Sequence, residues 1–262
     1  MSAQHQLYES KLACPVCHGK FLDGLRDAVQ CEECSLIYPV MNGTYNLVPP
    51  GILNDSRFQF ELERYDQIAV AGLRAYPGYL ATRPKERAEL IADLLRAHQV
   101  KEFVEVGPGF GSLLDRTRGL KRTAVELSTA FLTHLAVRLG EPDMCLVKGV
   151  AEYLPLASGT VPCLVMDGTF QSIVDRERFL YEVSRICAPG AMFVFTVAYG
   201  HNYPRRPQNG FNVNRPDELE TLRHFLEELG FDMEFRYRDL GAGKWVQIKD
   251  EGDYLYMVGR KS

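Results

Sequence analysis

Residues 103–112 read Phe-Val-Glu-Val-Gly-Pro-Gly-Phe-Gly-Ser, and this stretch decides the fold. An apolar run enters a cluster of three glycines, Gly107, Gly109 and Gly111. Such a run predicts a buried strand and a tight turn, where bare backbone lets a ligand approach the end of a sheet. The spacing G-x-G-x-G differs from the dinucleotide fingerprint G-x-G-x-x-G, and no Gly-Lys-Ser/Thr follows, which excludes a Walker loop. The stretch therefore predicts a strand–turn–helix unit for a ligand other than NAD or FAD, and a tight turn without a ligand is the alternative.

Segments with helical and extended patterns alternate along the chain around this stretch. Helices are expected over 54–80 in part, and over 84–98, 129–139, 176–188 and 216–229. Strands are expected over 102–106, 123–126, 144–147, 161–166, 191–197, 231–237 and 254–259. Ser128 and Asp175 each precede a helix as a candidate N-cap, and Pro189-Gly190 is expected to break the helix before residue 191. The alternation predicts an α/β fold with a doubly wound, mostly parallel sheet.

Four cysteines near the start of the chain form two CxxC pairs, Cys14 with Cys17 and Cys31 with Cys34. Two pairs of thiolates can close the tetrahedral sulfur site that Zn²⁺ prefers. The gap between the pairs is slightly shorter than is usual for this pattern, but a hairpin spans it. Two disulfides or four ordinary buried cysteines are the alternatives. We expect a zinc ribbon, because a segment of about 50 residues can hardly bury enough core to fold without such a staple.

The segment after these cysteines indicates where the ribbon ends. Asn42-Gly43 lies between two β-prone runs and predicts a hairpin, because both residues tolerate a positive φ. Pro49-Pro50-Gly51 then ends the module. We therefore expect a zinc ribbon over 1–51, a helical connector that caps the active site over 52–83, and a ligand-binding α/β domain over 84–262.

The composition is that of an ordinary globular protein, with 46% hydrophobic and 24% charged residues among 262. The apolar runs fall far below the roughly 20 residues that span a bilayer, and the start of the chain carries no basic-then-apolar export signal. Cys145, Cys163 and Cys187 lie in apolar stretches as small buried hydrophobes. Free thiols beside paired metal-site thiols indicate a reducing cytosol, so a cytoplasmic location is expected. The net charge of −4 argues against a dedicated nucleic-acid binder.

A second acid, Glu126, ends the strand that follows the glycines and lies 21 residues after Glu105. An acid at this place can bind ribose hydroxyls. The succession resembles that of class I S-adenosylmethionine (SAM)-dependent methyltransferases, over about residues 101–261. The resemblance implies a Rossmann-like methyltransferase fold and a SAM pocket lined by Glu105, the three glycines, Glu126 and Leu127. In that family the first acid lies near the methionyl amino end of SAM, and the second binds the ribose.

Residues 149–156 read Gly-Val-Ala-Glu-Tyr-Leu-Pro-Leu and look like the family's segment Gly-Asp-Ala-Glu-x-Leu-Pro-Phe, which touches the adenine. The resemblance therefore adds Val150, Ala151 and Glu152 to the cofactor-binding residues. Val150 stands where the family has Asp, so the backbone of Ala151 is expected to serve the adenine instead of a side chain. The segment ending Met-Asp-Gly-Thr-Phe matches the family's fourth strand and its loop, and adds Asp167 and Thr169.

Catalysis by a methyltransferase mainly needs alignment, because SAM already carries an activated methyl group. A base is needed only where the acceptor must lose a proton. The loop after the fourth strand faces the methyl group in this family, which selects Asp167 as a candidate catalytic residue. The polar stretch 199–216 is long for a connection and offers His201 as a general base, with Arg205 and Arg206 as an anion clamp. An ordinary loop histidine and solvated arginines are the alternatives.

The substrate is expected between these two loops and the connector, whose aromatic residues can exclude water. These residues are Phe58, Phe60, Tyr65 and Tyr76. A small-molecule substrate is favoured by the acidic net charge and by the lack of an Asp/Asn-Pro-Pro-Tyr signature, which is typical of methylation at an exocyclic base amine. An RNA methyltransferase and a non-catalytic module that binds SAM or a partner are the alternatives.

The ribbon itself resembles known modules. Its Cys-Pro-Val-Cys, Cys-Glu-Glu-Cys and Ile-Tyr-Pro-Val-Met-Asn-Gly-Thr segments look like small zinc-ribbon proteins that activate eukaryotic tRNA and rRNA methyltransferases. The order of ribbon and methyltransferase domain is similar to that of a bacterial large-subunit rRNA guanine methyltransferase. The same ribbon also occurs in methyltransferases of small-molecule and sugar pathways, so the ribbon does not choose between the two kinds of substrate.

Overall fold

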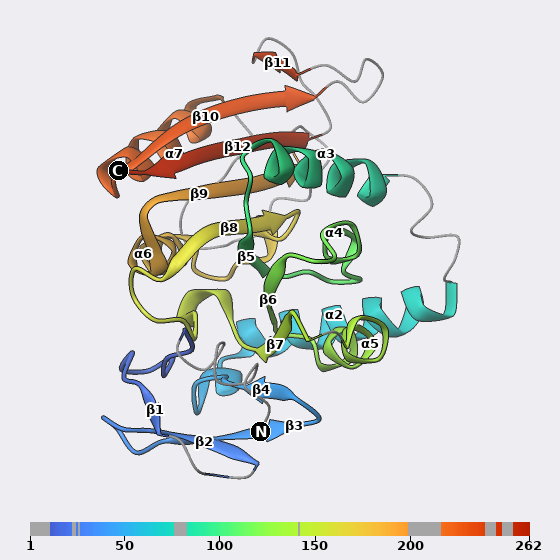
Figure 1. Cartoon of the computed structure of the whole chain (residues 1–262), viewed down its shortest axis with the longest axis vertical. Coiled ribbons are helices and arrows are strands. Elements are labelled where there is room, and N and C mark those ends of the chain that lie inside the picture. Colours follow the sequence, from blue (N-terminus) through green and yellow to red (C-terminus); the bar gives the residue numbers. More distant parts are fainter. Residues whose placement is uncertain are drawn as a thin grey trace.

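The computed structural model describes residues 11–22, 25, 27–75, 83–140, 142–198, 216–238, 245–247 and 254–262. The described strands form one sheet in the order β1-β2-β3-β4-β7-β6-β5-β8-β9-β12-β10-β11 (Figure 1). The strands are β1 (Phe21–Leu22), β2 (Ala28–Cys31), β3 (Ile37–Met41), β4 (Thr44–Asn46), β5 (Glu102–Val106), β6 (Lys121–Glu126), β7 (Met144–Lys148), β8 (Val161–Asp167), β9 (Cys187–Ala198), β10 (Phe231–Arg238), β11 (Trp245–Gln247) and β12 (Tyr254–Lys261). The helices are α2 (Ser56–Ala75), α3 (Arg83–Ala97), α4 (Ser112–Arg116), α5 (Thr129–Leu139), α6 (Arg176–Ile186) and α7 (Pro216–Glu228), with short 3₁₀ turns η1 (Ile52–Asn54), η2 (Ala151–Tyr153) and η3 (Phe170–Ser172).

The centre of the sheet is parallel and doubly wound, as the sequence predicts. Strands β4, β7, β6, β5, β8 and β9 pair in parallel, and β12 and β10 follow antiparallel. From β5 the chain proceeds to β6 and β7 on one side, and then crosses to β8 and β9 on the other. The order of the strands therefore reverses between β5 and β8, where an open α/β sheet forms its ligand crevice at the carboxyl ends.

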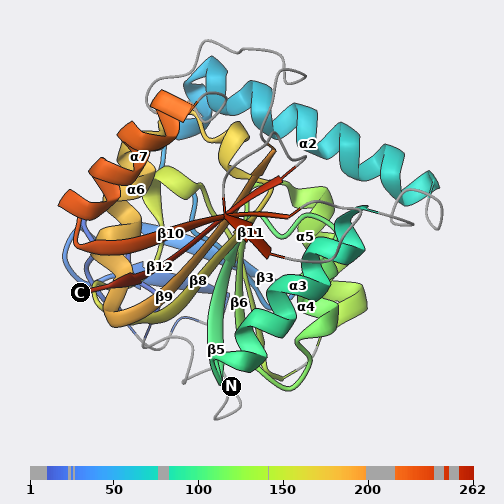
Figure 2. The same ribbon diagram turned by 90° about the horizontal axis from the view of Figure 1, so that it is seen from above.

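Helices cover both faces of this sheet. Alternate residues of β5 show the division: Phe103 packs in the cluster with α3, α4 and α5, whereas Val104 and Val106 pack in the cluster with α6 and α7. Figure 2 shows these two groups of helices on opposite sides of the sheet and α2 across one end of it. Parallel strands buried on both faces are apolar almost throughout, which is why the central strands were readable from the sequence.

Two details differ from the expected elements. The helix α6 ends at Ile186, and β9 begins at Cys187 and continues through Pro189 and Gly190 to the predicted apolar strand. The pairing of β8 with β9 shifts here, because Val161 pairs with Cys187 but Cys163 pairs with Met192. The Pro-Gly pair, with Gly190 at φ 75°, therefore forms a bulge within a strand instead of separating a helix from it. The three-residue strand β11 was not predicted, since so short a segment carries no periodicity.

The cysteine-bearing segment is continuous with the central sheet. Asn42 and Gly43 have φ values of 51° and 75° and join β3 to β4 by the predicted hairpin. Strand β4 then pairs in parallel with β7, so that Tyr45 lies beside Val147. Tyr38, Tyr45 and Leu47 belong to the same buried cluster as Val147. The segment thus shares the core of the α/β sheet and does not depend on its own core alone.

The helix α2 is the longest in the described part of the chain. Charged residues recur along it, and no described helix is long and apolar enough to cross a membrane.

Candidate functional site

A cavity of about 260 Å³ opens at the carboxyl ends of β5, β6 and β8. Its walls include the glycine turn after β5, the end of β6, residues 149–152 after β7, the loop after β8, and one face of α2. The cofactor-binding residues that the sequence predicts come together here, and all but Gly111 line the cavity: Glu105, Gly107, Gly109, Glu126, Leu127, Val150, Ala151, Glu152, Asp167 and Thr169. Their assigned roles in binding remain predictions.

The glycine turn adopts a backbone that only glycine accepts readily. Gly107, Gly109 and Gly111 have φ values of 70°, 53° and 73°, in the left-handed region that disfavours other residues. A Cβ on Gly107 would lie 2.5 Å from the side chain of Thr169. The Thr169 hydroxyl donates a hydrogen bond to the Gly107 carbonyl at 3.0 Å. The turn is therefore closed against the loop after β8, and both segments present backbone to the cavity.

Glu126 holds the glycine turn and the start of α5 together. Its Oε2 accepts a hydrogen bond from the Gly109 N–H at 3.2 Å, and its Oε1 accepts one from the Ser128 N–H at 2.9 Å. Ser128 caps α5 by accepting from the Phe131 N–H, as predicted. Burial raises the pKa of Glu126, while the N–H groups of Ser128 and Gly109 act in the opposite direction. Each carboxylate oxygen has a second lone pair that can accept from a ligand.

Glu105 lines the cavity with a carboxylate oxygen that has no hydrogen-bond partner among the described residues. The residue is buried, and this oxygen is its Oε2. Burial, together with the nearby carboxylates of Asp167 and Glu126, raises the pKa of Glu105 well above its ordinary value. An isolated buried carboxylate is costly. A ligand with a cationic or N–H donor at this position would therefore relieve this penalty.

Asp167 is held by two donors at the end of β8. Arg87 Nε donates to Asp167 Oδ1 at 2.8 Å, and Thr196 Oγ1 donates to the same oxygen at 2.5 Å. Thr196 Oγ1 also accepts from the Gly168 N–H at 2.9 Å. Arg87 on α3 and Thr196 on β9 were missed by the sequence analysis. The one signal for Arg87 is its place one turn before the apolar residue Ile91, on the inward face of the helix.

The segment after β7 forms an apolar wall with a buried acid behind it. Val150 packs with Phe58 and Val174. These apolar contacts suit a valine at the position where the sequence analysis noted an Asp in the similar family. Glu152 Oε1 accepts hydrogen bonds from the N–H groups of Val174 at 2.7 Å and Asp175 at 3.1 Å. Burial raises the pKa of Glu152 to about 7, although these N–H groups act against the increase. Its carboxylate therefore fixes the start of α6.

The connector covers the cavity with one face of α2. Phe58, Glu61, Tyr65 and Ile68 line the cavity, at the spacing of a single helical face. The hydroxyl of Tyr65 hydrogen-bonds with that of Ser172, which ties the helix to the loop after β8. Asp66 Oδ1 accepts from Ser128 Oγ at 2.5 Å and from the Ala130 N–H at 3.2 Å. The helix is thus fastened on both sides of the opening.

One member of the expected aromatic cover lies elsewhere. Phe60 is 56% exposed, because two residues after Phe58 is the opposite side of the helix. Four other expected residues, Tyr76, His201, Arg205 and Arg206, lie outside the described residues.

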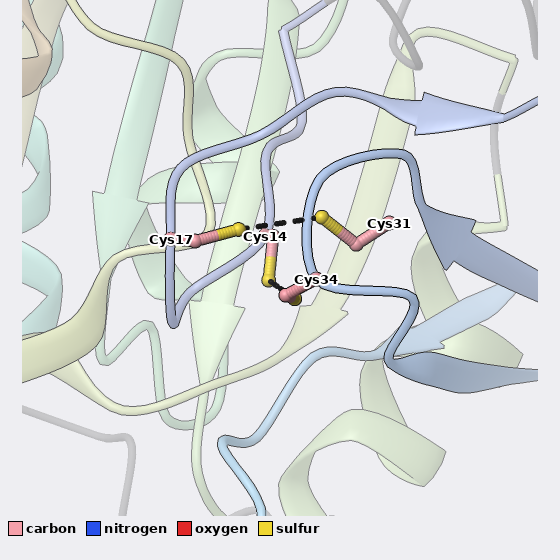
Figure 3. Close-up of side chains that lie close together, drawn as sticks. All are labelled: Cys14, Cys17, Cys31 and Cys34. Carbon is pink, nitrogen blue, oxygen red and sulfur yellow. Dashed lines mark hydrogen bonds between the residues drawn. The ribbon is translucent and has the colours of Figure 1, made fainter.

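The four N-terminal cysteines converge from two similar knuckles (Figure 3). Their sulfur atoms all lie within 4.8 Å of one another. The closest pairs are Cys17 with Cys31 at 3.4 Å and Cys14 with Cys34 at 3.6 Å, well beyond the ~2.05 Å of a disulfide. In the first knuckle the His18 N–H donates a hydrogen bond to the Cys14 carbonyl, and in the second the Ser35 N–H donates one to the Cys31 carbonyl. Both His18 and Ser35 have a positive φ. A compact set of four thiols on two matched turns fits a tetrahedral thiolate metal site.

Comparison with known proteins identifies the α/β part of the chain. Residues 104–195, from β5 to β9, match the family model described as "Methyltransferase domain". This part of the chain is a methyltransferase domain. The matched residues include the glycine turn, Glu126 and the segment 149–152.

Solved structures agree with the fold of this methyltransferase. A possible histamine N-methyltransferase from Thermotoga maritima is 17% identical, with a TM-score of 0.55 over 77% of this chain and 100% of that one. Phosphoethanolamine N-methyltransferase 2 from Haemonchus contortus, solved with phosphomonomethylethanolamine and S-adenosylhomocysteine, is 16% identical, with a TM-score of 0.56 over 78% and 60% of the two chains. A complex of the Haloferax volcanii Trm112 methyltransferase activator with a methyltransferase matches at 17% identity, with a TM-score of 0.50 over 75% and 97%. At these identities the likeness concerns the fold.

Proposed function

We propose that this methyltransferase binds SAM in the cavity at the carboxyl ends of β5, β6 and β8, and transfers its methyl group to a small-molecule acceptor held in the same cavity. The observation that carries the proposal is the cover formed by α2. Phe58, Tyr65 and Ile68 close over the glycine turn, and the contacts of Tyr65 and Asp66 fasten the helix in place. A covered cavity suits a compact acceptor better than a nucleotide within a folded RNA.

The charges that line the cavity support the same substrate class. Among the described residues five lining side chains are acidic, and Arg87 is the one basic side chain: the acids are Glu61, Glu105, Glu126, Glu152 and Asp167. An RNA methyltransferase needs basic surface for the phosphate backbone. A predominantly acidic lining disfavours a polyanion and tolerates the positively charged cofactor.

The cofactor positions follow from the donors and acceptors in the cavity. In the proposal, the unsatisfied Glu105 Oε2 accepts from the ammonium group of the methionyl moiety, and Glu126 accepts from the ribose hydroxyls through its remaining lone pairs. The backbone at Gly107 and Gly109 packs against the cofactor. Val150 and Leu127 provide apolar surface for the adenine, with the Ala151 backbone as its polar partner, while Glu152 and Thr169 fix the walls.

SAM supplies an electrophilic methyl group on a sulfonium leaving group, so the protein's own residues mainly align the acceptor. Asp167 stands at the end of β8, where Arg87 and Thr196 fix its orientation. We propose that it orients the acceptor through its second oxygen. The proposal keeps His201 as the base for an acceptor that must lose a proton. The tie between Tyr65 and Ser172 holds the cover that keeps water out.

We also propose that Cys14, Cys17, Cys31 and Cys34 hold one structural Zn²⁺. Four thiolates satisfy the tetrahedral preference of the ion and leave no open position for a substrate, which is the pattern of a structural site. The contacts of this segment with the central sheet then make it part of the methyltransferase fold.

The proposal is tested in two steps on the purified full-length protein. Calorimetry with S-adenosylhomocysteine is expected to show binding at one site per chain, and absence of binding would overturn the proposal. Transfer from SAM labelled in its methyl group is then measured on a panel of amines, phenols, thiols and carboxylic acids, with total RNA in parallel. Labelling of RNA alone would refute the small-molecule substrate and favour an RNA methyltransferase.

A further inference from the structure

The segment 148–157, between β7 and β8, has a second group of contacts besides those at the cavity. Its first half supplies the lining residues Gly149, Val150, Ala151 and Glu152. Apart from Lys148 at the end of β7 and a bridge at Leu156, the regular structure of this segment is the short 3₁₀ turn η2. The N-terminal segment of the chain holds it at both ends.

The first end is held through β4. Thr44, Tyr45 and Asn46 pair in parallel with Leu146, Val147 and Lys148 at the end of β7. The N–H of Leu47 then donates to the Lys148 carbonyl at 2.8 Å. Gly149 and Val150 follow directly, so this strand pairing fixes the point from which the cavity wall starts.

The second end is held by the residues that precede the first cysteine. The Ala13 N–H donates to the Pro155 carbonyl at 3.1 Å, and the Ala157 N–H donates to the Lys11 carbonyl at 2.8 Å. Between these two bonds Leu12 pairs with Leu156 in an antiparallel bridge, and both side chains are buried in the main core. Cys14 follows Ala13 directly. The cysteine cluster is therefore connected to residues 155–157, which follow the lining residues 149–152 after two residues, by this pairing.

The opposite side of the segment is held from α6, where Glu182 also lies 3.6 Å from His18 of the first cysteine knuckle. Arg185 on α6 donates to the carbonyls of Leu154 at 2.9 Å and Leu156 at 2.7 Å, and forms an ion pair with Glu182. These bonds keep the segment near the sheet, but they do not reach residues 149–152.

The lining half has anchors of its own, because the Gly149 N–H donates to the Glu126 carbonyl at 3.0 Å and Arg178 Nε donates to the Glu152 carbonyl at 3.0 Å. The contacts from residues 11–13 and from β4 fix the two ends of the segment between which these anchors lie.

We propose that Leu12 and Ala13 are positioning residues for the cofactor, and that they couple the metal-bound state of the four-cysteine cluster to the affinity for SAM through the segment 148–157. The inference rests on the proposed function, since it takes the cavity as the SAM site. Its physical basis is that the apparent affinity for a ligand falls in proportion to the fraction of molecules whose binding-site wall has the binding-competent conformation. The cluster then acts on cofactor binding without touching the cofactor.

The first test compares two large-to-small substitutions within the same buried cluster. Leu12→Ala removes the partner of Leu156, whereas the control Val29→Ala lies on β2, two strands away from β4. Both variants should keep one zinc per chain and both should melt at lower temperature, because each leaves a cavity. We expect Leu12→Ala to weaken S-adenosylhomocysteine binding about fivefold or more, and Val29→Ala to change it less than about twofold. Equal effects of the two variants, or no effect of either, would overturn the coupling.

The second test needs no variant and follows amide hydrogen exchange before and after removal of zinc with a chelator. Exchange is expected to rise in 28–41 and in 149–157 together, while 102–113 stays protected. Continued protection of 149–157 while 28–41 exchanges freely would refute the coupling. Simultaneous loss of protection in all three segments would refute it too, since the metal would then hold the whole fold. The wild-type titration separates the two levels: no binding contradicts the proposed function, whereas binding that ignores Leu12 contradicts only the coupling.

Discussion

Substitution of Glu126 by Gln tests the cofactor site most directly. The two side chains have nearly the same shape, so the change replaces one carboxylate oxygen by an NH₂ group and removes the charge. Glu126 accepts from the N–H groups of Gly109 and Ser128 through different oxygens. The amide oxygen of the glutamine in Glu126→Gln can therefore accept only one of these two hydrogen bonds. The NH₂ group of the glutamine then faces the other backbone N–H, so that two donors meet.

The expected magnitude follows from these contacts. Loss of one hydrogen bond to a charged acceptor lowers the stability of the free protein by about 1.5–3 kcal/mol, but removal of a buried charge offsets part of this loss. The free energy of cofactor binding has no such offset, because the ribose hydroxyls lose a charged acceptor and the glycine turn loses one of its hydrogen bonds. We therefore expect S-adenosylhomocysteine to bind about 10- to 100-fold more weakly, corresponding to about 1.4–2.7 kcal/mol.

Calorimetry on the folded variant measures this effect, and Glu89→Gln is the matched control. Glu89 lies on α3, its side chain is 64% exposed, and it pairs with Arg116 away from the cavity. This control removes the same charge and should leave the affinity unchanged. An affinity of Glu126→Gln within about twofold of the wild type would refute our assignment of the ribose position.

Four further predictions concern other parts of the molecule. Metal analysis should find one zinc per chain in the wild type and substantially less in Cys31→Ala, with faster amide exchange in 28–41; equal zinc in both proteins would contradict the ligand set. Gly109→Val should weaken S-adenosylhomocysteine binding about tenfold by calorimetry, because φ is 53° at this residue; unchanged binding would remove the glycine turn from the site. His201→Ala should lower kcat about 100-fold for an acceptor that loses a proton, with cofactor affinity intact, and a fall of less than about threefold would leave alignment as the whole mechanism. Glu152 has a folded-state pKa raised to about 7, so it retains protons that the unfolded chain releases, and its contribution to stability falls as the pH rises from about 4.5 to 7. Chemical denaturation should therefore show a smaller loss of stability over this range in Glu152→Gln, whose oxygen can keep both backbone bonds, and parallel pH profiles would refute the shift.

Local patterns account for the parts of this structure that the sequence predicted. The strand before the glycines is apolar because both faces of the sheet are covered, and Gly107 and Gly109 are needed where φ is positive. Ser128 and Asp175 act as caps through their own side chains, within three residues of their partners. The glycine turn and the two caps are decided by neighbours along the chain, and the burial of the strand on both faces is visible in its apolar residues.

The missed features depend on residues that are distant in sequence. Arg87 and Asp167 form their ion pair across 80 positions, and the place of Arg87 on the inward face of its helix does not reveal which residue it pairs with. The pairing of β4 with β7 likewise has no local signature, because any short β-prone strand can complete the edge of a sheet. At Pro189-Gly190 the local signal for a break was real, but the parallel pairing of β8 and β9 on both sides of it extended the strand through a bulge.

The pairing of β4 with β7 has a consequence for the order in which the chain is made. Strand β4 is synthesised about 100 residues before its partner β7, so the contact between them has a high sequence separation. Until β7 is synthesised, the apolar side chains of Tyr45 and Leu47 have no core to enter. The two cysteine turns can form earlier, because all four cysteines lie within residues 14–34. The cysteine turns are thus made before the centre of the sheet, and β4 can dock only after β7 has been synthesised.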